Sequence, residues 1–133
     1  MEINTMTLRA LDNLSKAYAP YSKFSVGAAL LTTDGEIFDG VNVENASYGL
    51  TICAERSAVV NAVAAGKHDF KAIAIACGNG DFCTPCGACR QVLAEFSPNM
   101  DVIMVNSEGE TKTVSLAELL PNNFSLKGVQ KNV

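Results

Sequence analysis

Residues 53–77 read CAERSAVVNAVAAGKHDFKAIAIAC, and this stretch decides the fold that we predict. Its first half, residues 53–65, is rich in Ala and Val and is followed by Gly66, a residue that commonly ends helices, so we predict a buried helix. Its end, residues 71–77, places two Ile residues between small ones and is followed by another glycine, which predicts a short buried strand. Helix and strand therefore alternate here, as they do in α/β proteins.

The residues before this stretch predict a helix and a hairpin. In residues 5–18 apolar side chains recur at roughly helical spacing, and Pro20 ends that helix. These apolar side chains are Met6, Leu8, Leu11, Leu14 and Tyr18. Residues 26–31 and 36–43 are each of strand length, and Asp34-Gly35 between them is typical of a hairpin turn. An antiparallel hairpin thus precedes the alternating part of the chain.

The residues after this stretch predict a helix, two strands and a final short helix. We predict a helix over residues 87–96, strands over 102–105 and 111–114, and a helix that starts at the capping-box sequence of Ser115 and ends at Pro121. A hairpin followed by strand–helix alternation indicates one mixed sheet. We therefore expect a three-layer α/β/α fold, in which a mixed five-stranded sheet has helices on both faces.

Length, composition and charge limit what the chain can do. Its 133 residues fit one domain, which we place at residues 1–133, and its 48% hydrophobic and 18% charged residues predict a globular protein. The net charge is −4 and no Lys or Arg cluster is present, so a nucleic-acid polymer is not an expected partner. No apolar run reaches the ~18 residues of a membrane span, and the N-terminal sequence lacks the features of a signal peptide. We expect a cytoplasmic protein without a membrane partner.

Five cysteines carry the strongest functional signal, and they are Cys53, Cys77, Cys83, Cys86 and Cys89. Their number is odd and three of them are crowded together, which favours metal binding or catalysis over a disulfide framework. The spacing Cys86-x-x-Cys89 lets two thiolates reach one metal ion from a single turn, and the predicted helix start favours thiolate over thiol. Redox dithiols and zinc sites both use such a pair, so the spacing alone leaves both open.

Cys53 and Glu55 extend this pair to a candidate catalytic site. Cys53 also lies at a predicted helix start, and with Cys86 and Cys89 it can supply three ligands to a tetrahedral zinc ion, whose fourth position stays open for water. Glu55 is then a carboxylate beside the open position that can accept and return a proton. Three thiolates and Zn²⁺ leave one net negative charge, which Arg56 and the helix N-termini can offset.

Several separated motifs occur in one order along the chain: YAPYSKF at 18–24, NVENASY at 42–48, CAER at 53–56, PCGACRQ at 85–91 and LLP at 119–121 ahead of Phe124. Cys-x-Glu followed by Pro-Cys-x-x-Cys is the signature of zinc deaminases, here in its three-cysteine form. By these motifs the sequence resembles the cytidine deaminases, in particular the short, homotetrameric, zinc-dependent type that acts on free nucleosides. The resemblance covers nearly the whole chain.

The resemblance implies a role for each residue of the metal site. Cys53, Cys86 and Cys89 would hold one Zn²⁺ per chain, Glu55 would carry protons, and Arg56 would soften the thiolate charge by hydrogen-bonding to ligand sulfur atoms. The implied reaction is hydrolytic deamination, in which cytidine or deoxycytidine gives uridine or deoxyuridine and ammonia, as in pyrimidine salvage. No organic cofactor is implied.

The resemblance also implies how a free nucleoside would be bound. Asn42 and Glu44 would hydrogen-bond the ribose hydroxyls. Phe24 would stack near the pyrimidine, and the backbone at Ala54 would read the polar edge of the base. In a homotetramer the active sites would be shared, because two further residues would complete each pocket across a subunit interface. These residues are Tyr48 and Phe124.

Other interpretations stay open at this point. The site could belong to a deaminase of another aminopyrimidine nucleoside, to a redox dithiol protein, or to a zinc-stabilised binding module in which Cys83 is a fourth ligand and Glu55 is dispensable. An iron–sulfur cluster is not expected, because Leu93 stands where that run would need a further cysteine. We expect Cys83 to be a free loop thiol and Cys77 to be a packed core residue.

Overall fold

The structure is a computed structural model and describes residues 2–126. Its helices and strands follow the predicted order. They are α1 (Glu2–Asn13), β1 (Val26–Thr32), β2 (Ile37–Val41), α2 (Ala54–Ala64), β3 (Phe70–Cys77), α3 (Gly87–Phe96), β4 (Asp101–Val105), β5 (Thr111–Ser115) and α4 (Leu116–Leu119). Two short 3-10 helices, η1 (Leu14–Lys16) and η2 (Tyr48–Leu50), complete the set of described elements. Five strands form one sheet in the order β2-β1-β3-β4-β5, in which β3 and β4 pair in parallel and the other neighbours pair antiparallel.

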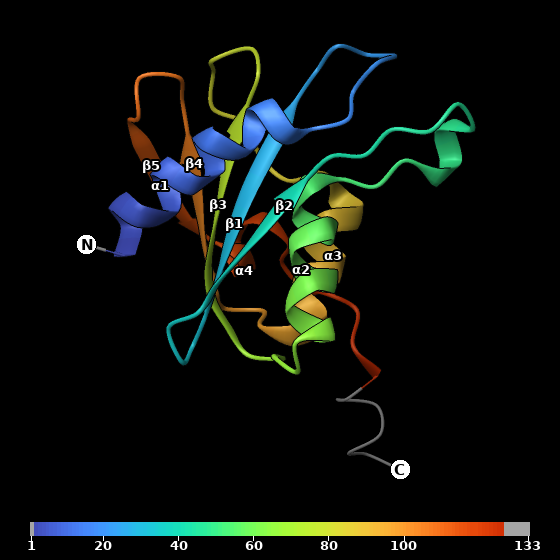
Figure 1. The fold of residues 1–133 in the computed structure, drawn as a ribbon. Helices are drawn as coiled ribbons and strands as arrows, with labels where there is room; N and C mark the ends of the chain where they lie inside the picture. The colour runs from blue at the N-terminus through green and yellow to red at the C-terminus, as the bar shows by residue number, and fades with distance from the viewer. Residues whose placement is uncertain (1, 127–133) are drawn as a thin grey trace.

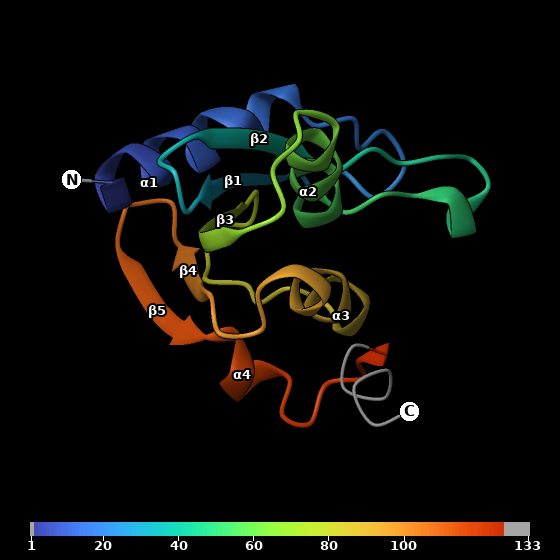
Figure 2. The same cartoon turned by 90° about the horizontal axis from the view of Figure 1, so that it is seen from below.

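Helices cover both faces of this sheet, as Figures 1 and 2 show. Helix α1 lies across one face, and α2 and α3 lie together on the other face. The predicted three-layer α/β/α fold with a mixed five-stranded sheet is therefore confirmed. Because α2 and α3 share a face, their N-terminal ends can meet at one site.

Strand β3 shows how the sequence separates the two sides of the core. Side chains alternate along a strand, so Ile73 and Ile75 point to the face that carries α2 and α3, and Ala72, Ala74 and Ala76 point to the face that carries α1. The small alanine side chains let α1 approach the sheet closely. The larger Ile side chains fill the space beneath the two helices that carry the cysteines.

Helix α1 differs from its prediction. It begins earlier than predicted and ends at Asn13, and Leu8 and Tyr18 are exposed rather than packed in the core. Of the predicted apolar residues, Met6 is fully buried and Leu11 and Leu14 pack against the core, while Thr7, Ala10 and Asn13 complete the buried side of α1. The Asn13 amide donates a hydrogen bond of 3.0 Å to the carbonyl of a residue in β1. A polar residue thus docks this helix, which apolar spacing alone does not reveal.

The second predicted strand also ends earlier than expected. Strand β2 ends at Val41, and Val43 forms only isolated bridges, to Tyr18 and to Ile52. The chain then leaves the body of the molecule in an extended excursion that contains η2 and returns to α2 (Figure 1). This excursion forms one border of the pocket described below.

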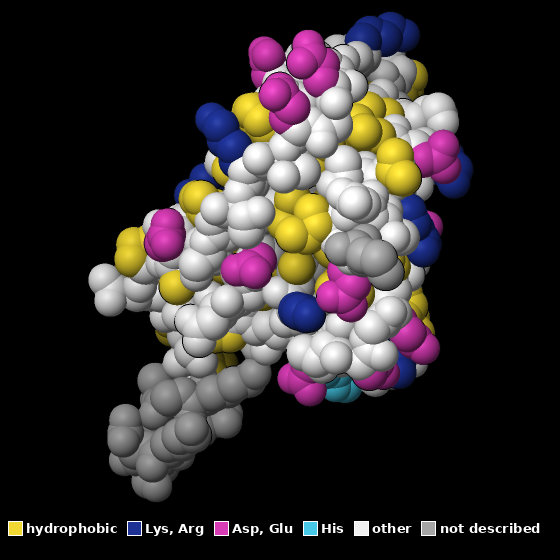
Figure 3. Space-filling model, turned by 90° about the vertical axis from the view of Figure 1, so that its left-hand side faces the viewer, with side chains coloured by type: hydrophobic (Ala, Val, Ile, Leu, Met, Phe, Trp, Pro, Cys, Tyr) yellow, Lys and Arg dark blue, Asp and Glu magenta, His cyan; other side chains and the backbone are white. Residues whose placement is uncertain are grey.

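Helix α4 starts at Ser115, as the sequence predicts. The Ser115 hydroxyl accepts a hydrogen bond of 3.2 Å from the backbone N–H of Ala117 at the start of α4. Among residues 2–126, no helix combines the length and the hydrophobicity needed to cross a bilayer. On the face drawn in Figure 3, Lys and Arg side chains do not gather into one continuous patch.

Candidate metal centre and active-site pocket

Three cysteines from two helices come together at one point. Cys53 is the N-cap residue of α2, Cys86 is the N-cap residue of α3, and Cys89 lies in the first turn of α3. Their sulfur atoms all lie within 4.8 Å of one another, with 3.4 Å between Cys86 and Cys89 and 4.0 Å between Cys53 and Cys86. The structure thus brings together the three predicted ligands, and both helices start where the sequence places them.

This donor set fits a zinc ion. Zn–S bonds of about 2.3 Å in a tetrahedron place sulfur atoms about 3.8 Å apart, which is close to the spacings found here. Within the described part of the chain, no fourth Cys, His, Asp or Glu joins the cluster. A tetrahedral zinc held by Cys53, Cys86 and Cys89 would therefore keep an open position, as catalytic rather than structural zinc sites do.

Helix ends and Arg56 favour negative charge at this cluster. The Arg56 Nη2 atom lies 3.6 Å from the Cys53 sulfur and 3.3 Å from the Thr51 carbonyl oxygen. A hydrogen bond from Cys89 and the nearby guanidinium lower the pKa of Cys53 to about 5, despite partial burial. The same hydrogen bond and burial raise the pKa of Cys89.

Glu55 lies in the first turn of α2, two residues after Cys53, and its side chain is only 5% exposed. Burial, reinforced by the negative charge of Cys53, raises the pKa of the Glu55 carboxyl above its usual range. A carboxyl group with a raised pKa can hold and return a proton near neutral pH, as a general acid–base requires. Glu55 and Cys53 both line the pocket described next.

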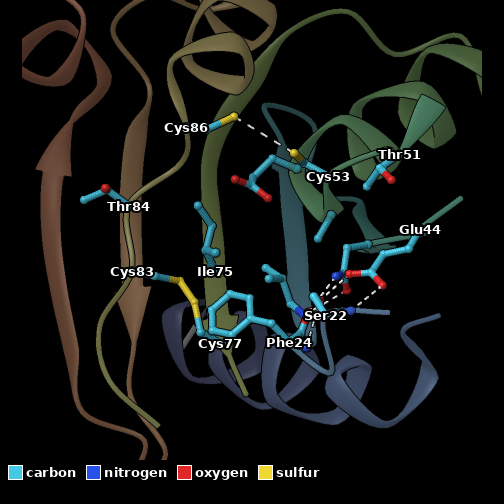
Figure 4. Close-up of a pocket in the computed structure, with 14 residues that line it drawn as sticks. Ser22, Phe24, Glu44, Thr51, Cys53, Ile75, Cys77, Cys83, Thr84 and Cys86 are labelled. Atoms are coloured by element: carbon cyan, nitrogen blue, oxygen red, sulfur yellow. Dashed lines mark hydrogen bonds between the residues drawn. A yellow bond between two sulfur atoms is a disulfide. The ribbon is translucent and has the colours of Figure 1, made fainter. Parts of the chain in front are cut away.

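A pocket of about 300 Å³ opens beside the cysteine cluster. This volume is at the lower end of the range of ligand pockets, about 300–1,000 Å³, and it suits a small molecule. Figure 4 shows Cys53 and Cys86 at one end of the pocket and Phe24 toward the other. Ala54 also lines it. The predicted metal site, proton carrier and aromatic residue therefore share one cavity.

Asn42 and Glu44 lie at the same pocket, but the two side chains differ in how they are held. The Asn42 amide is buried and bridges the backbone, donating to the Phe24 carbonyl (2.8 Å) and accepting from Val26 N–H (2.9 Å). One Glu44 oxygen accepts from the backbone N–H groups of Tyr21 (3.0 Å) and Ser22 (3.1 Å).

The second Glu44 oxygen accepts a short hydrogen bond from the Ser22 hydroxyl. Hydrogen bonds from the side chain and backbone of Ser22 keep the pKa of Glu44 below its usual range, so this carboxylate stays ionised. Asn42 thus fixes the backbone beneath Phe24, and Glu44 presents a fixed negative charge at the rim.

Tyr48 and Phe124 do not line this pocket. Their side chains are 78% and 67% exposed, and the Phe124 backbone carbonyl accepts a hydrogen bond of 2.9 Å from Gln91. Tyr48 instead borders a neighbouring cavity of about 430 Å³ with Ser22 and Glu44. Within the described chain the two predicted interface residues are therefore separate from the cavity that holds the cysteines.

The prediction of a free Cys83 thiol is wrong, because Cys83 forms a disulfide with Cys77. Cys77 ends β3 and is buried, as predicted for a core residue. The loop after β3 turns back so that the two Cα atoms lie 6.4 Å apart, a distance within the normal range for a disulfide. Cys83 is therefore not a fourth zinc ligand, and the remaining three cysteines are free.

Some pocket residues were not singled out from the sequence. Ser22, which holds Glu44, lies inside the quoted motif at 18–24, so a signal for it existed. Ile75 and Thr84 also line the pocket, but they carry no chemical signature and are found only through the fold. A three-sulfur centre that leaves room for a water, with a buried carboxylate beside it in a small-molecule pocket, is typical of the zinc deaminases, a class of zinc-dependent hydrolases.

Comparison with known proteins identifies the family. The family model described as the cytidine and deoxycytidylate deaminase zinc-binding region matches residues 1–105. The sequence is 44% identical over 126 residues to the cytidine deaminase of Sporosarcina psychrophila, which covers 94% of this chain and 93% of the relative. It is 54% identical over 117 residues to a probable cytidine deaminase of Dictyostelium discoideum, which covers 87% of this chain and 79% of the relative.

The solved structures agree with the sequence comparison. The crystal structure of cytidine deaminase from Burkholderia pseudomallei matches with a TM-score of 0.85 at 48% identity, covering 90% of this chain and 97% of that chain. The chain therefore belongs to the cytidine and deoxycytidylate deaminase family.

Proposed function

We propose that this chain catalyses the hydrolytic deamination of cytidine and deoxycytidine to uridine and deoxyuridine, with release of ammonia, and that it serves pyrimidine salvage. The observation that carries the proposal is the buried Glu55 carboxyl in a pocket beside a cluster of three thiols, which no fourth Cys, His, Asp or Glu of the described chain joins. Family membership supports the choice of a cytosine nucleoside as substrate.

Glu55 performs the proton transfers in the proposed mechanism. Zinc, when held by Cys53, Cys86 and Cys89, supplies Lewis acidity at its open position and so favours deprotonation of water. Glu55 accepts that proton and donates it to N3 of the cytosine ring as water adds to C4. It then takes the proton from the new C4 hydroxyl and passes it to the exocyclic amine, so that the C4–N bond breaks, ammonia leaves and the carbonyl of the uracil forms. One water is consumed for each ammonia released.

The pocket residues orient the nucleoside in this proposal. Phe24 stacks near the base, and backbone groups at Ala54 hydrogen-bond its polar edge. The ionised Glu44 is fixed by Ser22 and accepts hydrogen bonds from ribose hydroxyls. Asn42 donates through the amide hydrogen that its backbone contacts leave free. These contacts favour a ribose-sized substrate over a free base.

The proposed assembly is a homotetramer in which Tyr48 and Phe124 complete the pocket of a neighbouring subunit. The high exposure of both side chains supports this assembly. Other large apolar side chains are exposed in the excursion that contains Tyr48, among them Leu50 at 65%. Sedimentation is expected to show a species several times 14.0 kDa. A fully active monomer would contradict shared active sites. We place the enzyme in the cytoplasm, because the three ligand thiols must stay reduced.

Ammonia release from cytidine by zinc-loaded protein tests the proposal. The variant Glu55→Gln is expected to keep one zinc per chain and to lose about 10²- to 10⁴-fold in kcat, because its amide cannot carry the proton. Glu108→Gln, on an exposed turn, is the matched control and is expected to react normally. Normal turnover by Glu55→Gln would refute the mechanism. Zinc binding without ammonia release from cytidine or deoxycytidine would move the search to other aminopyrimidine nucleosides.

A further inference from the structure

We propose that Cys77 and Cys83 form a thiol–disulfide site in the wall of the substrate pocket, which exchanges with small thiols and disulfides of the glutathione class and so sets the affinity for the nucleoside. The inference rests on the proposed function only for the identity of that nucleoside. It concerns the two cysteines that the metal site does not use.

The disulfide belongs to the pocket itself. Cys77 and Cys83 both line the cavity that contains Glu55 and Phe24, and Figure 4 shows the disulfide at the opposite end from Cys53. The pocket is open to solvent, and Cys83 is partly exposed whereas Cys77 is only 3% exposed. A small thiol entering the pocket therefore reaches the Cys83 sulfur more easily than the Cys77 sulfur.

The loop that carries Cys83 is held firmly at both of its ends. At the first end, the Gly78 N–H donates to the Ser25 carbonyl (2.7 Å), and the Gly80 carbonyl accepts from Ser107 N–H (2.9 Å). At the other end, the Pro85 carbonyl accepts a hydrogen bond of 2.8 Å from Arg90 Nε. These bonds do not depend on the disulfide.

Between these ends the disulfide is the one covalent tie, and it adds to the packing of Phe82 and Cys83 against the core. In the described part of the chain, no backbone hydrogen bond was found for residues 82–84. The Phe82 ring packs below Lys112 Nζ, which lies 4.7 Å from the ring centroid, but Cys83 and Thr84 form the pocket wall itself. The covalent bond to Cys77 therefore restrains the Cys83 and Thr84 part of this wall beyond what core packing alone provides.

The exchange chemistry balances without a further reactant. A small thiolate attacks the Cys83 sulfur, forms a mixed disulfide with it and displaces Cys77 as a thiolate, which takes up a proton. A second small thiolate attacks the small-molecule sulfur of the mixed disulfide and displaces Cys83. The net result is two protein thiols and one small-molecule disulfide. Oxidation is the reverse reaction with a disulfide of the same class, and disulfides in reducing compartments are commonly of this transient kind.

Reduction is expected to loosen the wall but to spare the metal site. Cys83 and Thr84 lose their covalent tie, so ordering this part of the wall again on substrate binding costs affinity, and KM is expected to rise roughly threefold to tenfold. The loop end next to Cys86 remains held through Pro85 and Arg90, so zinc content and kcat are expected to stay unchanged. The split between KM and kcat distinguishes this loosening from damage to the zinc site.

The test compares zinc-loaded protein before and after reduction with tris(2-carboxyethyl)phosphine. Mass spectrometry after alkylation in denaturant and zinc removal is expected to find three reactive cysteines before reduction and five after it. KM, kcat and zinc content for cytidine are measured on the same samples. The variant Cys83→Ser is expected to have the raised KM without any reduction, and the phosphine is expected not to change its KM.

Amide hydrogen exchange of residues 79–84 supplies a readout that needs no substrate. It is expected to be faster in the reduced protein and in Cys83→Ser than in the oxidised protein. Equal exchange rates and equal KM values in the two redox states would overturn the inference, as would five reactive cysteines in air-oxidised protein. No ammonia release in either state, with the exchange difference present, would count against the proposed function and not against the thiol–disulfide site.

Discussion

The replacement Gly40→Ala tests how the sheet positions α2, the helix that carries the proposed proton carrier Glu55. Gly40 lies in β2, and a Cβ atom added there would be 2.2 Å from the Ala54 carbonyl oxygen and 2.6 Å from the Ala58 backbone nitrogen. Both are backbone atoms, so no side-chain rotation relieves the clash. An ordinary contact begins at 3.4 Å, and α2 must therefore move away by about 1 Å.

This movement displaces the turn that carries both Cys53 and Glu55. We expect a loss of about 1–3 kcal/mol in the free energy of unfolding, which corresponds to a fall in Tm of roughly 3–10 °C. We also expect kcat/KM to fall on the order of 100-fold, because a catalytic group displaced by about 1 Å misses its target. Calorimetry, zinc content and ammonia-release rates measure these effects. Gly49→Ala is the control for stability, because its added Cβ would meet nothing within 4 Å. Wild-type Tm and kcat/KM in Gly40→Ala would refute the reasoning.

Two further predictions concern charges. Arg56→Met removes the guanidinium beside the Cys53 sulfur, and we expect the zinc affinity, measured by competition with a chelator, to fall roughly 10-fold. An unchanged zinc affinity would show that this contact does not stabilise the site. Hydrogen bonds from Arg9 and Asn13 outweigh the effect of burial and hold the pKa of Asp39 below its usual 3.8. The ionised Asp39 therefore stabilises the fold above about pH 4, and this stabilisation is lost as the pH falls through the folded-state pKa. Asp39→Asn is therefore expected to cost about 0.5–1 kcal/mol at pH 7, a small value because the pair is partly exposed, and less at pH 3 in urea titrations; an equal cost at both pH values would contradict the assignment.

The fold was predictable where local sequence determines local structure. The alternation of Ile and Ala in β3 predicted a strand, and it also separates the two faces of the core. Apolar spacing predicted part of the buried face of α1, since Met6 is buried and Leu11 packs against the core, but it did not predict Ala10 and Asn13. Ala10 is buried because it packs on the alanine surface of the sheet, and Asn13 because it donates a hydrogen bond to the carbonyl of Ala28. Only the folded sheet supplies these partners.

The metal-binding part of the candidate site was predictable from local sequence, but the disulfide beside it was not. The ligand set lies at two helix starts that local sequence marks, so Cys53 and the pair Cys86 and Cys89 could be expected to meet. The disulfide between Cys77 and Cys83 could not, because it depends on the path by which the loop returns to the end of β3. Odd cysteine counts argue against a complete disulfide framework, but they do not exclude one bridge beside a metal site.

The spacing of Cys53 and Glu55 follows from the geometry of a helix start. Cys53 is the N-cap, and the hydrogen bond from Cys89 and the Arg56 guanidinium lower its pKa to about 5 despite partial burial. Two residues further on, Glu55 has turned by about 200° around the axis and lies deeper, where burial raises its pKa instead. One helical turn thereby holds two groups whose proton affinities move in opposite directions, which is the division of roles that acid–base catalysis at a metal site needs. A carboxylate one position earlier, at Ala54, would sit about 100° away from this direction, so the single intervening residue is a consequence of the helix and not of the chemistry alone.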